Sequence, residues 1–396
     1  MYTEIINEEY AVLQHARDIA RLGRRALILT GRQSAKRNGS LMELQKALQD
    51  TRTEYIIYDR IEENPSVETI LEARDLGVSK GADLCIGLGG GSPMDAAKAV
   101  SILLYHSEKG ADFLYQKPGP FEKDENGHTL AYPVIAIPTT CGTGSEVTGV
   151  SVLTRHDLQT KKSLPHILYP DIALLDPRYL MYAPYEILRN TAIDTMSHLI
   201  ESYINTKATE ESKKLVIEGL KLWRRGKEVI LGTRKVGYTK DEHIGNISDY
   251  VRRKSDPDKA EADKITDLKI LNDMLMASNI AGQAIAITGT SLPHALSYRL
   301  TYQAGIAHGP ATGIFQPGFV RYADEMTQKK LLRAMDFADL DSFKKFLGMT
   351  CDIRGLNETS YGIIVENSIK DILREPARIE KVPYPVNREV LEDIVT

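Results

Sequence analysis

The first half of this chain alternates short apolar runs with stretches of helical pattern, and this alternation restricts the possible folds more than any other feature. The apolar runs, each predicted as a buried strand, are residues 26–30, 55–58, 84–88, 134–137 and 172–175. The helices predicted after the first three runs are residues 41–48, 66–76 and 93–104. Such alternation predicts a parallel sheet covered by helices on its faces. Residues 147–153 are predicted to form a small hairpin arm.

After about residue 184 strand-like runs nearly vanish, and apolar residues recur at helical spacing. The junction at 176–184 is rich in prolines, which is typical of a domain boundary. A length of 396 residues also suits two domains of ordinary size. We therefore predict a dinucleotide-binding α/β domain with a parallel, Rossmann-like sheet at residues 1–180 and an all-helical domain at 181–396. The highly charged stretch 232–269 is interpreted as a solvated insertion or mobile loop.

Charge and cysteine content argue against several classes of protein. The formal net charge of −4 provides no polybasic surface for nucleic acid or for an anionic membrane. The three cysteines are scattered and include no C-x-x-C pair, so a disulfide framework is not expected. The N-terminal sequence lacks the apolar region of a signal peptide, and no apolar run approaches the length of a membrane span. We expect a cytoplasmic protein that acts on small molecules.

A glycine-rich turn, Gly89 to Asp95, joins the third predicted strand to the helix after it. Its three glycines let a ligand approach the backbone closely, because no Cβ intervenes. Ser92 is predicted as the N-cap of the helix, and Asp95 as the acid of a capping box. The N-terminus of such a helix suits the pyrophosphate of a dinucleotide. A tight turn without a ligand is the alternative, since the spacing is not the G-x-G-x-x-G of the Rossmann fingerprint.

A second polar turn, Pro138 to Glu146, follows the next apolar run and is dense in hydroxyls and small residues. Its Thr139 and Thr140 are suited to hydrogen-bond a phosphate or a ribose, although a loop of this composition also simply caps a strand. Open α/β sheets bind ligands at the carboxyl ends of their strands. Two polar turns at such ends therefore favour a nucleotide site.

Asp194 and His198 lie four residues apart in a helical pattern, which puts both side chains on one helix face. With His294 and His308 they form a plausible ligand set for Fe²⁺ or Zn²⁺, one carboxylate and three imidazoles. Each residue also has an ordinary alternative, as a polar helix residue or a buried histidine with a hydrogen-bond partner. Spacing alone does not bring His294 and His308 to Asp194.

Four sets of residues, in order along the chain, resemble the motifs of the iron-containing (group III) alcohol dehydrogenases. They are GGGSPMDAAKA, PTTCGTGSEVT, DTMSH and the pair HAL and HG, and the match runs from the first strand to beyond His308. The resemblance implies a dehydroquinate synthase-like architecture, with an N-terminal dinucleotide-binding domain and a C-terminal helical metal-binding domain. It also implies a homodimer, a NADP or NAD cofactor, and Fe²⁺, with Zn²⁺ as the alternative metal.

The same resemblance implies roles for individual residues. The metal ligands that it implies are Asp194, His198, His294 and His308. The residues that it places on the pyrophosphate are Gly89, Gly90, Gly91 and Ser92. Those that it places elsewhere on the cofactor are Thr139 and Thr140, with Asn64, Asp95 and Lys162 near the nicotinamide and ribose.

The chain departs from the family pattern at two positions. Some members carry a further histidine where this chain has Tyr298, so a proton relay through that histidine does not carry over. Tyr298 or an ordered water is the hypothetical substitute. Several NAD-specific members have an aspartate where this chain has Gly31, and that carboxylate repels a 2′-phosphate. Because Gly31 leaves room and the segment 32–37 is basic, we predict a preference for NADP over NAD.

Together these observations predict a metal-dependent alcohol dehydrogenase or aldehyde reductase that transfers hydride reversibly between NAD(P)(H) and a primary alcohol or aldehyde. A glycerol dehydrogenase-like polyol oxidoreductase is the nearest alternative. A lyase of the dehydroquinate synthase type would need basic residues around a phosphorylated substrate, and we identify no such cluster near the predicted ligands. A non-catalytic metal- or nucleotide-binding protein is a further alternative, against which the complete ligand set argues.

Overall fold

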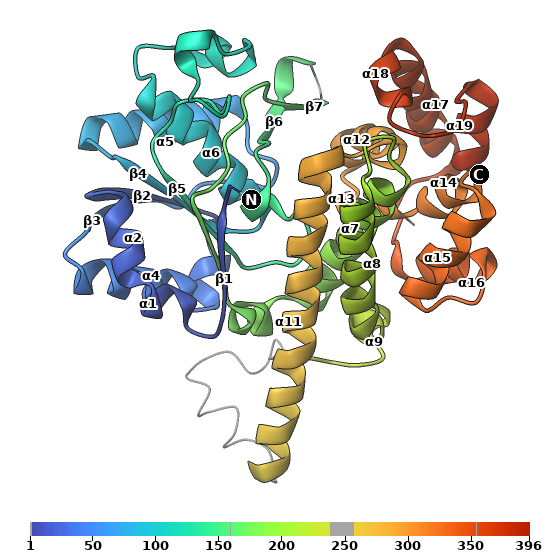
Figure 1. The fold of residues 1–396 in the computed structure, drawn as a ribbon, viewed down its shortest axis with the longest axis horizontal. Coiled ribbons are helices and arrows are strands. Elements are labelled where there is room, and N and C mark those ends of the chain that lie inside the picture. Colours follow the sequence, from blue (N-terminus) through green and yellow to red (C-terminus); the bar gives the residue numbers. More distant parts are fainter. Residues whose placement is uncertain (1, 159, 238–256, 354) are drawn as a thin grey trace. The chain divides into compact units, whose positions relative to one another are not determined.

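The structure, a computed structural model, describes residues 2–158, 160–237, 257–353 and 355–396 (Figure 1). The chain divides into two compact units. The sheet unit consists of Met1–Thr140, Ser145–Pro184 and Val236–Asn272, and the helical unit of Cys141–Gly144, Tyr185–Lys235 and Asp273–Thr396. Cys141–Gly144 thus belongs to the helical unit although the residues on either side belong to the sheet unit, and the reverse holds for Val236–Asn272.

The sheet unit contains a six-stranded sheet in the order β1-β8-β5-β4-β2-β3, in which every neighbouring pair of strands is parallel. The strands are β1 (Glu4–Asn7), β2 (Arg25–Thr30), β3 (Glu54–Tyr58), β4 (Leu84–Gly89), β5 (Val134–Pro138) and β8 (Ile172–Leu175). The parallel sheet confirms the predicted α/β fold class. Five of the strands correspond to predicted apolar runs, and β1 does not. β1, which pairs with β8 at one edge of the sheet, has the sequence EIIN with only two apolar residues, so it lacks the longer apolar run by which the other strands were predicted.

The predicted hairpin arm is displaced along the chain. The antiparallel pair consists of β6 (Val152–Arg155) and β7 (Thr160–Ser163), so the prediction at 147–153 was placed too early. Residues 145–147 form a 3₁₀ helix instead. Val147 and Leu153 are buried, which explains why this segment has the apolar spacing that suggested a strand.

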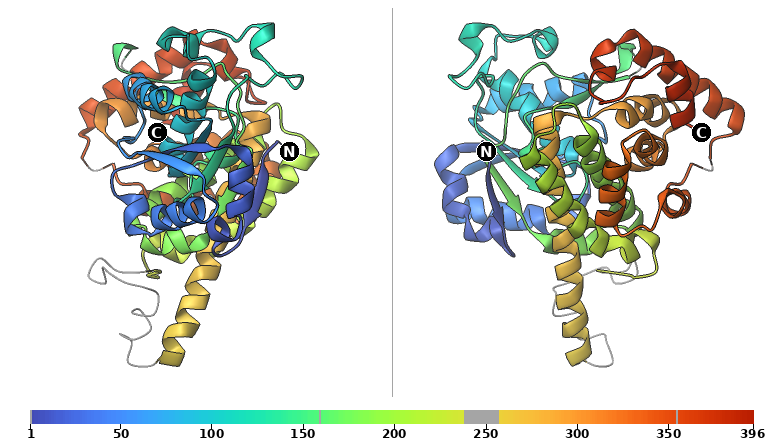
Figure 2. Two further views of the ribbon diagram at one scale, coloured as in Figure 1. Left: turned by 90° about the vertical axis from the view of Figure 1, so that its left-hand side faces the viewer. Right: turned by 45° about the vertical axis from the view of Figure 1, so that its right-hand side comes forward.

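Helices cover both faces of the sheet, as Figures 1 and 2 show. Buried residues of α5 (Val67–Lys80) and α6 (Gly91–Tyr105), such as Ile70 and Val100, form one apolar core with the sheet. Those of α2 (Ala16–Leu22) and α4 (Ser40–Asp50), such as Ile19 and Leu44, form a second. The central strands are therefore buried on both sides and read as continuous apolar runs. The helices of this unit before β5 are α1 (Ala11–Gln14), α2 (Ala16–Leu22), α3 (Ser34–Arg37), α4 (Ser40–Asp50), α5 (Val67–Lys80) and α6 (Gly91–Tyr105).

The order of the strands reverses beside β2. From β2 the chain adds β3 on one side and then returns to add β4 and β5 on the other. In open α/β sheets ligands bind outside the carboxyl ends of the strands at such a reversal. Gly31 follows β2 and the glycine-rich turn follows β4, so both lie at the edge of the sheet where this rule puts a ligand.

In the helical unit every regular element among the described residues is a helix, as predicted. The helices are α7 (Tyr185–Ile204), α8 (Glu210–Trp223), α9 (Lys227–Leu231), the part of α11 (Pro257–Thr288) from Asp273 onward, α12 (Leu292–Ala304), α13 (His308–Gly313), α14 (Gln316–Arg321), α15 (Glu325–Met335), α16 (Leu340–Thr350), α17 (Glu358–Arg374), α18 (Pro376–Ile379) and α19 (Arg388–Ile394). Within this unit α7 packs against α8 and α13, and α12 against α13 and α17.

The charged stretch 232–269 is only partly a loop. Residues 238–256 lie outside the described residues, and 257–269 form the first turns of α11. The prediction of a mobile loop is therefore wrong for 257–269, where a helix forms although the sequence has little apolar periodicity. Among the described residues we find no helix with the length and hydropathy needed to span a membrane. Cys85, Cys141 and Cys351 are buried free thiols, in line with the prediction that no disulfide framework forms.

Candidate metal centre and nucleotide-binding turns

Helix α7 supplies three buried polar side chains from one face. Asp194 and His198 are predicted metal ligands, and Glu201, in the next turn, was missed by sequence reasoning. Steps of four and then three residues put the three on the same side of a helix. The sequence signal that was available is this spacing, which puts a second carboxylate on the face of the predicted ligands.

His294 and His308 come to this face from two other helices. His294 lies in the first turn of α12, and His308 is the first residue of α13. Asp194 Oδ1 lies 3.5 Å from His294 Nε2, and 3.9 Å from the Nε2 atoms of both His198 and His308. One ligand atom each from Asp194, His294 and His308 forms a group in which all lie within 4.8 Å of one another. His198 is outside that group, and its ring stacks on His294 with centroids 4.5 Å apart.

A glycine permits the close packing that brings His308 to α7. A Cβ on Gly309 would lie 1.8 Å from the carbonyl oxygen of Asn190, so only glycine fits between the two backbones. One turn later, a Cβ on Gly313 would lie 2.5 Å from Ile193. The first turn of α13 therefore lies directly against α7, beside Asp194.

The electrostatics of the group favour a positive charge at its centre. Burial alone would raise the pKa of Asp194, but the imidazoles of His198, His308 and His294 lower it below the usual range. Burial also lowers the pKa of His198. For His294 the carboxylates of Glu201 and Asp194 outweigh burial and raise the pKa to about 9. The ionised carboxylate of Asp194 and the lowered pKa of His198, which favours its neutral ring, are the charge states in which these groups bind a cation.

The residues present fit a divalent metal ion. Asp194 Oδ1 and His294 Nε2 are buried, and neither has a hydrogen-bond partner within the described part of the chain. A buried polar atom without a partner costs about 1–3 kcal/mol, so such atoms normally have a role. Carboxylate oxygen and imidazole nitrogen are ligands that both Fe²⁺ and Zn²⁺ accept. A cation in contact with both atoms would satisfy them.

Glu201 accepts hydrogen bonds from three partners behind the ligand face. Its Oε2 accepts from the backbone N–H of Ser291 at 2.6 Å. Its Oε1 lies 2.6 Å from His294 Nδ1 and accepts from Gln316 Nε2 at 3.0 Å. Glu201 is thus bound to the side of His294 that faces away from Asp194.

In the sheet unit the glycine-rich turn is shaped by close contacts with the helix that follows it. Gly89 has a φ of 148°, and a Cβ there would lie 2.8 Å from Pro93. Helix α6 begins at Gly91 with Gly90 as its N-cap, so the prediction that Ser92 is the N-cap is wrong. Ser92 lies within the first turn, and its Oγ accepts a hydrogen bond from the N–H of Asn64 at 3.0 Å. A glycine N-cap leaves the first N–H groups of the helix without a side-chain acceptor, open to an anion.

Asn64, predicted near the cofactor, does lie beside this turn. Its Oδ1 accepts a hydrogen bond from Lys161 Nζ at 3.0 Å. Lys162, the predicted neighbour, is exposed, and its Nζ lies 5.9 Å from the ring centroid of Tyr115. Neighbouring side chains of a strand point to opposite faces. Lys161 therefore reaches Asn64, whereas Lys162, the next residue of β7, points away from it.

Asp95 is not the acid of a capping box, as the sequence suggested, but one member of a buried ionic cluster. The ammonium of Lys98, which has no exposed surface, lies 3.2 Å from Asp95 Oδ1. It donates to Ser145 Oγ at 2.8 Å and to the carbonyl oxygens of Ser145, Thr148 and Val150. Sequence reasoning missed Lys98, which ties α6 to the loop after β5.

The two polar turns lie side by side at the ends of neighbouring strands. The N–H of Thr139 donates to the carbonyl oxygen of Gly89 at 2.8 Å, and Thr139 is buried. A Cβ on Gly90 would lie 3.3 Å from Thr140 Oγ1. The structure therefore brings together the glycines and threonines that sequence reasoning selected separately.

Comparisons with known proteins show which family this chain belongs to. Residues 3–177 match the family model of the iron-containing alcohol dehydrogenases, and residues 258–347 match the model for the C-terminal part of that family. The solved iron-containing alcohol dehydrogenase of Thermotoga maritima is 31% identical, with a TM-score of 0.79, and the match covers 100% of this chain and 97% of that one. The chain belongs to the iron-containing alcohol dehydrogenase family.

Members of this family are oxidoreductases that act on CH–OH groups and use a metal and a NAD(P) cofactor. Long-chain-alcohol dehydrogenase 1 of Geobacillus thermodenitrificans is 29% identical over 79% of this chain and 70% of its own length. The NADPH-dependent butanol dehydrogenase of Clostridium saccharobutylicum is 26% identical over 76% of this chain and 68% of its own length. The first name refers to a long-chain alcohol and the second to butanol, so the named substrates differ in chain length.

Tyr298, where some members of this family have a histidine, lies beside the ligand group. Its ring stacks on that of His308 with centroids 6.2 Å apart. Burial raises the pKa of Tyr298, against the opposing effect of the nearby Arg378 guanidinium. The hydroxyl therefore keeps its proton at neutral pH.

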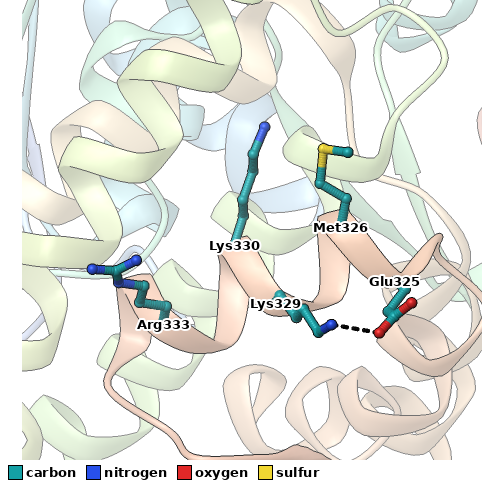
Figure 3. Close-up of a pocket in the computed structure, with 5 residues that line it drawn as sticks. All are labelled: Glu325, Met326, Lys329, Lys330 and Arg333. Carbon is teal, nitrogen blue, oxygen red and sulfur yellow. Dashed lines mark hydrogen bonds and ion pairs between the residues drawn. The ribbon is translucent and has the colours of Figure 1, made fainter.

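A separate surface cavity of about 400 Å³ runs along α15 in the helical unit (Figure 3). The residues that line it all come from this one helix and are Glu325, Met326, Lys329, Lys330 and Arg333. Lys329 is paired with Glu325, as the dashed line in Figure 3 marks. This cavity contains none of the predicted site residues, and we do not assign it a role in the reaction.

Proposed function

We propose that this chain is a metal-dependent alcohol dehydrogenase, or aldehyde reductase, that transfers hydride reversibly between NADP(H) and a primary alcohol or aldehyde. The observation that carries the proposal is the convergence of Asp194, His294 and His308 within 4.8 Å, with two buried atoms that lack hydrogen-bond partners among the described residues. Family membership supports an oxidoreductase acting on CH–OH.

We propose Asp194, His198, His294 and His308 as the ligands of Fe²⁺, with Zn²⁺ as the alternative. His198 would join the group by a small movement, because its Nε2 lies 3.9 Å from Asp194 Oδ1. A divalent cation held there supplies a Lewis acid that polarises a carbonyl oxygen, which contributes several kcal/mol to the stabilisation of the transition state. The carboxylate of Asp194 and the imidazoles of His294 and His308 already hold one ligand atom each within 4.8 Å of one another.

For the cofactor, we propose that the N-terminus of α6 binds the pyrophosphate through backbone N–H groups. The residues assigned to this contact are Gly89, Gly90, Gly91 and Ser92, with Thr139 and Thr140 beside them. These residues would orient a bound NADP(H), which would supply the hydride acceptor or donor. Asn64 and Asp95 are assigned a supporting role. The backbone N–H of Asn64 donates to Ser92 Oγ in the turn, and the carboxylate of Asp95 accepts from Ser145 Oγ and from the N–H of Val152 in the neighbouring loop.

The preference for NADP rests on the residues that follow β2. A Cβ on Gly31 would meet nothing closer than 3.6 Å, so packing does not require a glycine there. Arg32 and Arg37 are exposed, and their guanidinium groups can pair with a 2′-phosphate. Lys36 already forms an ion pair with Asp59, at 2.6 Å. The similarity to an NADPH-dependent butanol dehydrogenase supports the same preference.

We also propose that Tyr298, or an ordered water, takes the place in a proton relay of the histidine found in some family members. If so, a Tyr298→Phe variant turns over more slowly at saturating substrate while its metal content stays the same. Unchanged turnover would remove Tyr298 from the mechanism.

The function is tested by elemental analysis of the purified protein and a panel of short and long primary alcohols and aldehydes with NADPH and NADH. We expect one divalent transition metal per chain, consumption of NADPH with an aldehyde, and a higher kcat/KM with NADPH than with NADH. Net consumption of NADPH excludes a lyase that regenerates its cofactor, and glycerol in the panel separates a polyol oxidoreductase. Metal-replete protein that oxidises no alcohol and reduces no aldehyde would contradict the proposal. Light scattering of the purified protein tests the proposed homodimer.

A further inference from the structure

Glu201 is a carboxylate with no exposed surface in the interior of the helical unit. Its three hydrogen-bond partners come from separate parts of the chain: a backbone N–H that precedes α12, the imidazole of His294, and the amide of Gln316 in α14. A buried carboxylate is strongly disfavoured unless it is paired and hydrogen-bonded. Three partners within 2.6–3.0 Å satisfy that requirement.

The chemistry of these partners decides which nitrogen of His294 carries a proton. The N–H of Ser291 and the amide NH₂ of Gln316 are donors, so both oxygens of Glu201 act as acceptors. His294 Nδ1, at 2.6 Å from Oε1, therefore carries the hydrogen and donates a hydrogen bond to Glu201. When Nδ1 holds the proton, the lone pair of neutral imidazole is on Nε2, which is the atom 3.5 Å from Asp194 Oδ1.

We propose that Glu201 is a positioning residue, which fixes the tautomer and ring orientation of His294 so that Nε2 is presented to the metal. Its negative charge, added to that of Asp194, also balances the charge of a divalent cation in a buried site. Histidine ligands commonly donate their second N–H to a carboxylate, and removing that partner typically weakens metal binding about 10- to 100-fold. This inference rests on the proposed metal site.

The test compares Glu201→Gln with a matched control, Ser202→Ala, in the full-length protein. Glutamine has the same shape but only one acceptor oxygen, so it cannot accept from both Ser291 N–H and His294 Nδ1–H. Ser202 is the next residue of α7, is equally buried, and accepts a different hydrogen bond, from Thr288 Oγ1 at 3.0 Å. Zn²⁺ affinity is measured by competition with a chromophoric chelator, and the site geometry by the visible absorption of the Co²⁺-loaded protein.

We expect Glu201→Gln to bind Zn²⁺ about 10- to 100-fold more weakly than wild type and to change the Co²⁺ spectrum. Ser202→Ala should keep both the affinity and the spectrum, even where it lowers the melting temperature of the metal-free protein. Equal affinity and an identical spectrum for Glu201→Gln would overturn the inference and leave the proposed function standing. Equal losses in the two variants would also overturn it. A wild-type protein that binds neither ion would overturn the proposed function together with this inference.

A measurement on the wild-type protein covers the case in which Glu201→Gln does not fold. In Zn²⁺-loaded protein labelled with ¹⁵N-histidine, the ring of His294 is expected to carry its proton on Nδ1 and to bind zinc through Nε2. A proton on Nε2, with Nδ1 bound to zinc, would overturn the inference directly.

Discussion

Each unit of this protein has a buried cluster of charged side chains, and the two differ in how completely their hydrogen bonds are satisfied. In the sheet unit, Lys98 donates to several oxygens around Asp95 and Ser145, and the cluster supplies its own cation. In the helical unit, Asp194 Oδ1 and His294 Nε2 have no hydrogen-bond partner among the described residues. A saturated cluster stabilises a fold, whereas an unsaturated one is suited to a ligand from solution.

The largest effect is expected when the unsaturated cluster loses its charge. Asp194→Asn keeps the shape of the side chain but removes the carboxylate from a group of imidazoles. We expect loss of bound metal and a fall in kcat/KM of about a thousandfold, equivalent to about 4 kcal/mol of transition-state stabilisation. Elemental analysis and steady-state kinetics measure the two effects. The affinity for NADPH, measured by its fluorescence, should be unchanged. If the variant also lost NADPH affinity, the metal site and the nucleotide site would not be independent of each other.

A different result is expected when the saturated cluster loses its cation. Lys98→Met leaves Asp95 without its cation and the loop carbonyls without the ammonium that donates to them, and breaking a buried pair in this way costs roughly 3 kcal/mol. Chemical denaturation should show this loss in the free energy of unfolding, while the metal content per folded chain stays the same. A variant as stable as wild type would show that the cluster does not hold the sheet unit together.

Removing the metal tests whether the helical unit gains stability from its ligand. At a free metal concentration of 100 times Kd, binding stabilises the folded state by about 2.7 kcal/mol. A chelator should therefore lower the melting temperature of wild type and leave that of Asp194→Asn unchanged. Equal shifts in both proteins would indicate that the metal acts at another site.

Two glycines of the sheet unit allow a matched comparison. Gly89→Ala forces a Cβ to 2.8 Å from Pro93 at a φ of 148°, a strain of about 1–3 kcal/mol, and should weaken NADPH binding. Gly31→Ala puts a Cβ no closer than 3.6 Å to any neighbour and should leave NADPH binding unchanged. If both variants bind NADPH like wild type, the shape of the glycine-rich turn does not contribute to the cofactor site.

The smallest effect concerns the choice of cofactor. Gly31→Asp adds a carboxylate where the 2′-phosphate is proposed to lie, and a repulsion of about 1.4 kcal/mol lowers the ratio of kcat/KM for NADPH to that for NADH about tenfold. Steady-state kinetics with both cofactors measures the ratio. An unchanged ratio would mean that the phosphate binds elsewhere, and the Gly31→Ala variant controls for steric effects.

The sequence by itself determined the features that depend on neighbours along the chain. Continuous apolar runs predicted the central strands β2, β4, β5 and β8, because strands covered on both faces are largely apolar. The run Tyr55–Tyr58 also predicted β3, although β3 lies at an edge of the sheet. Helical spacing likewise put Asp194 and His198 on one face of α7. Features with weak local signals were missed or misplaced, as with the edge strand β1, the hairpin β6–β7 and the first turns of α11.

Tertiary structure alone decided which distant residues meet. About a hundred residues separate His294 and His308 from α7, and it is the contact of Gly309 with the backbone of Asn190 that brings His308 to Asp194. Glu201, Lys98 and Lys161 likewise bond to partners that lie far away in the sequence, His294, Ser145 and Asn64. Periodicity tells which face of an element is polar, but the partner of that face depends on how helices and strands pack, and packing is a property of the whole fold.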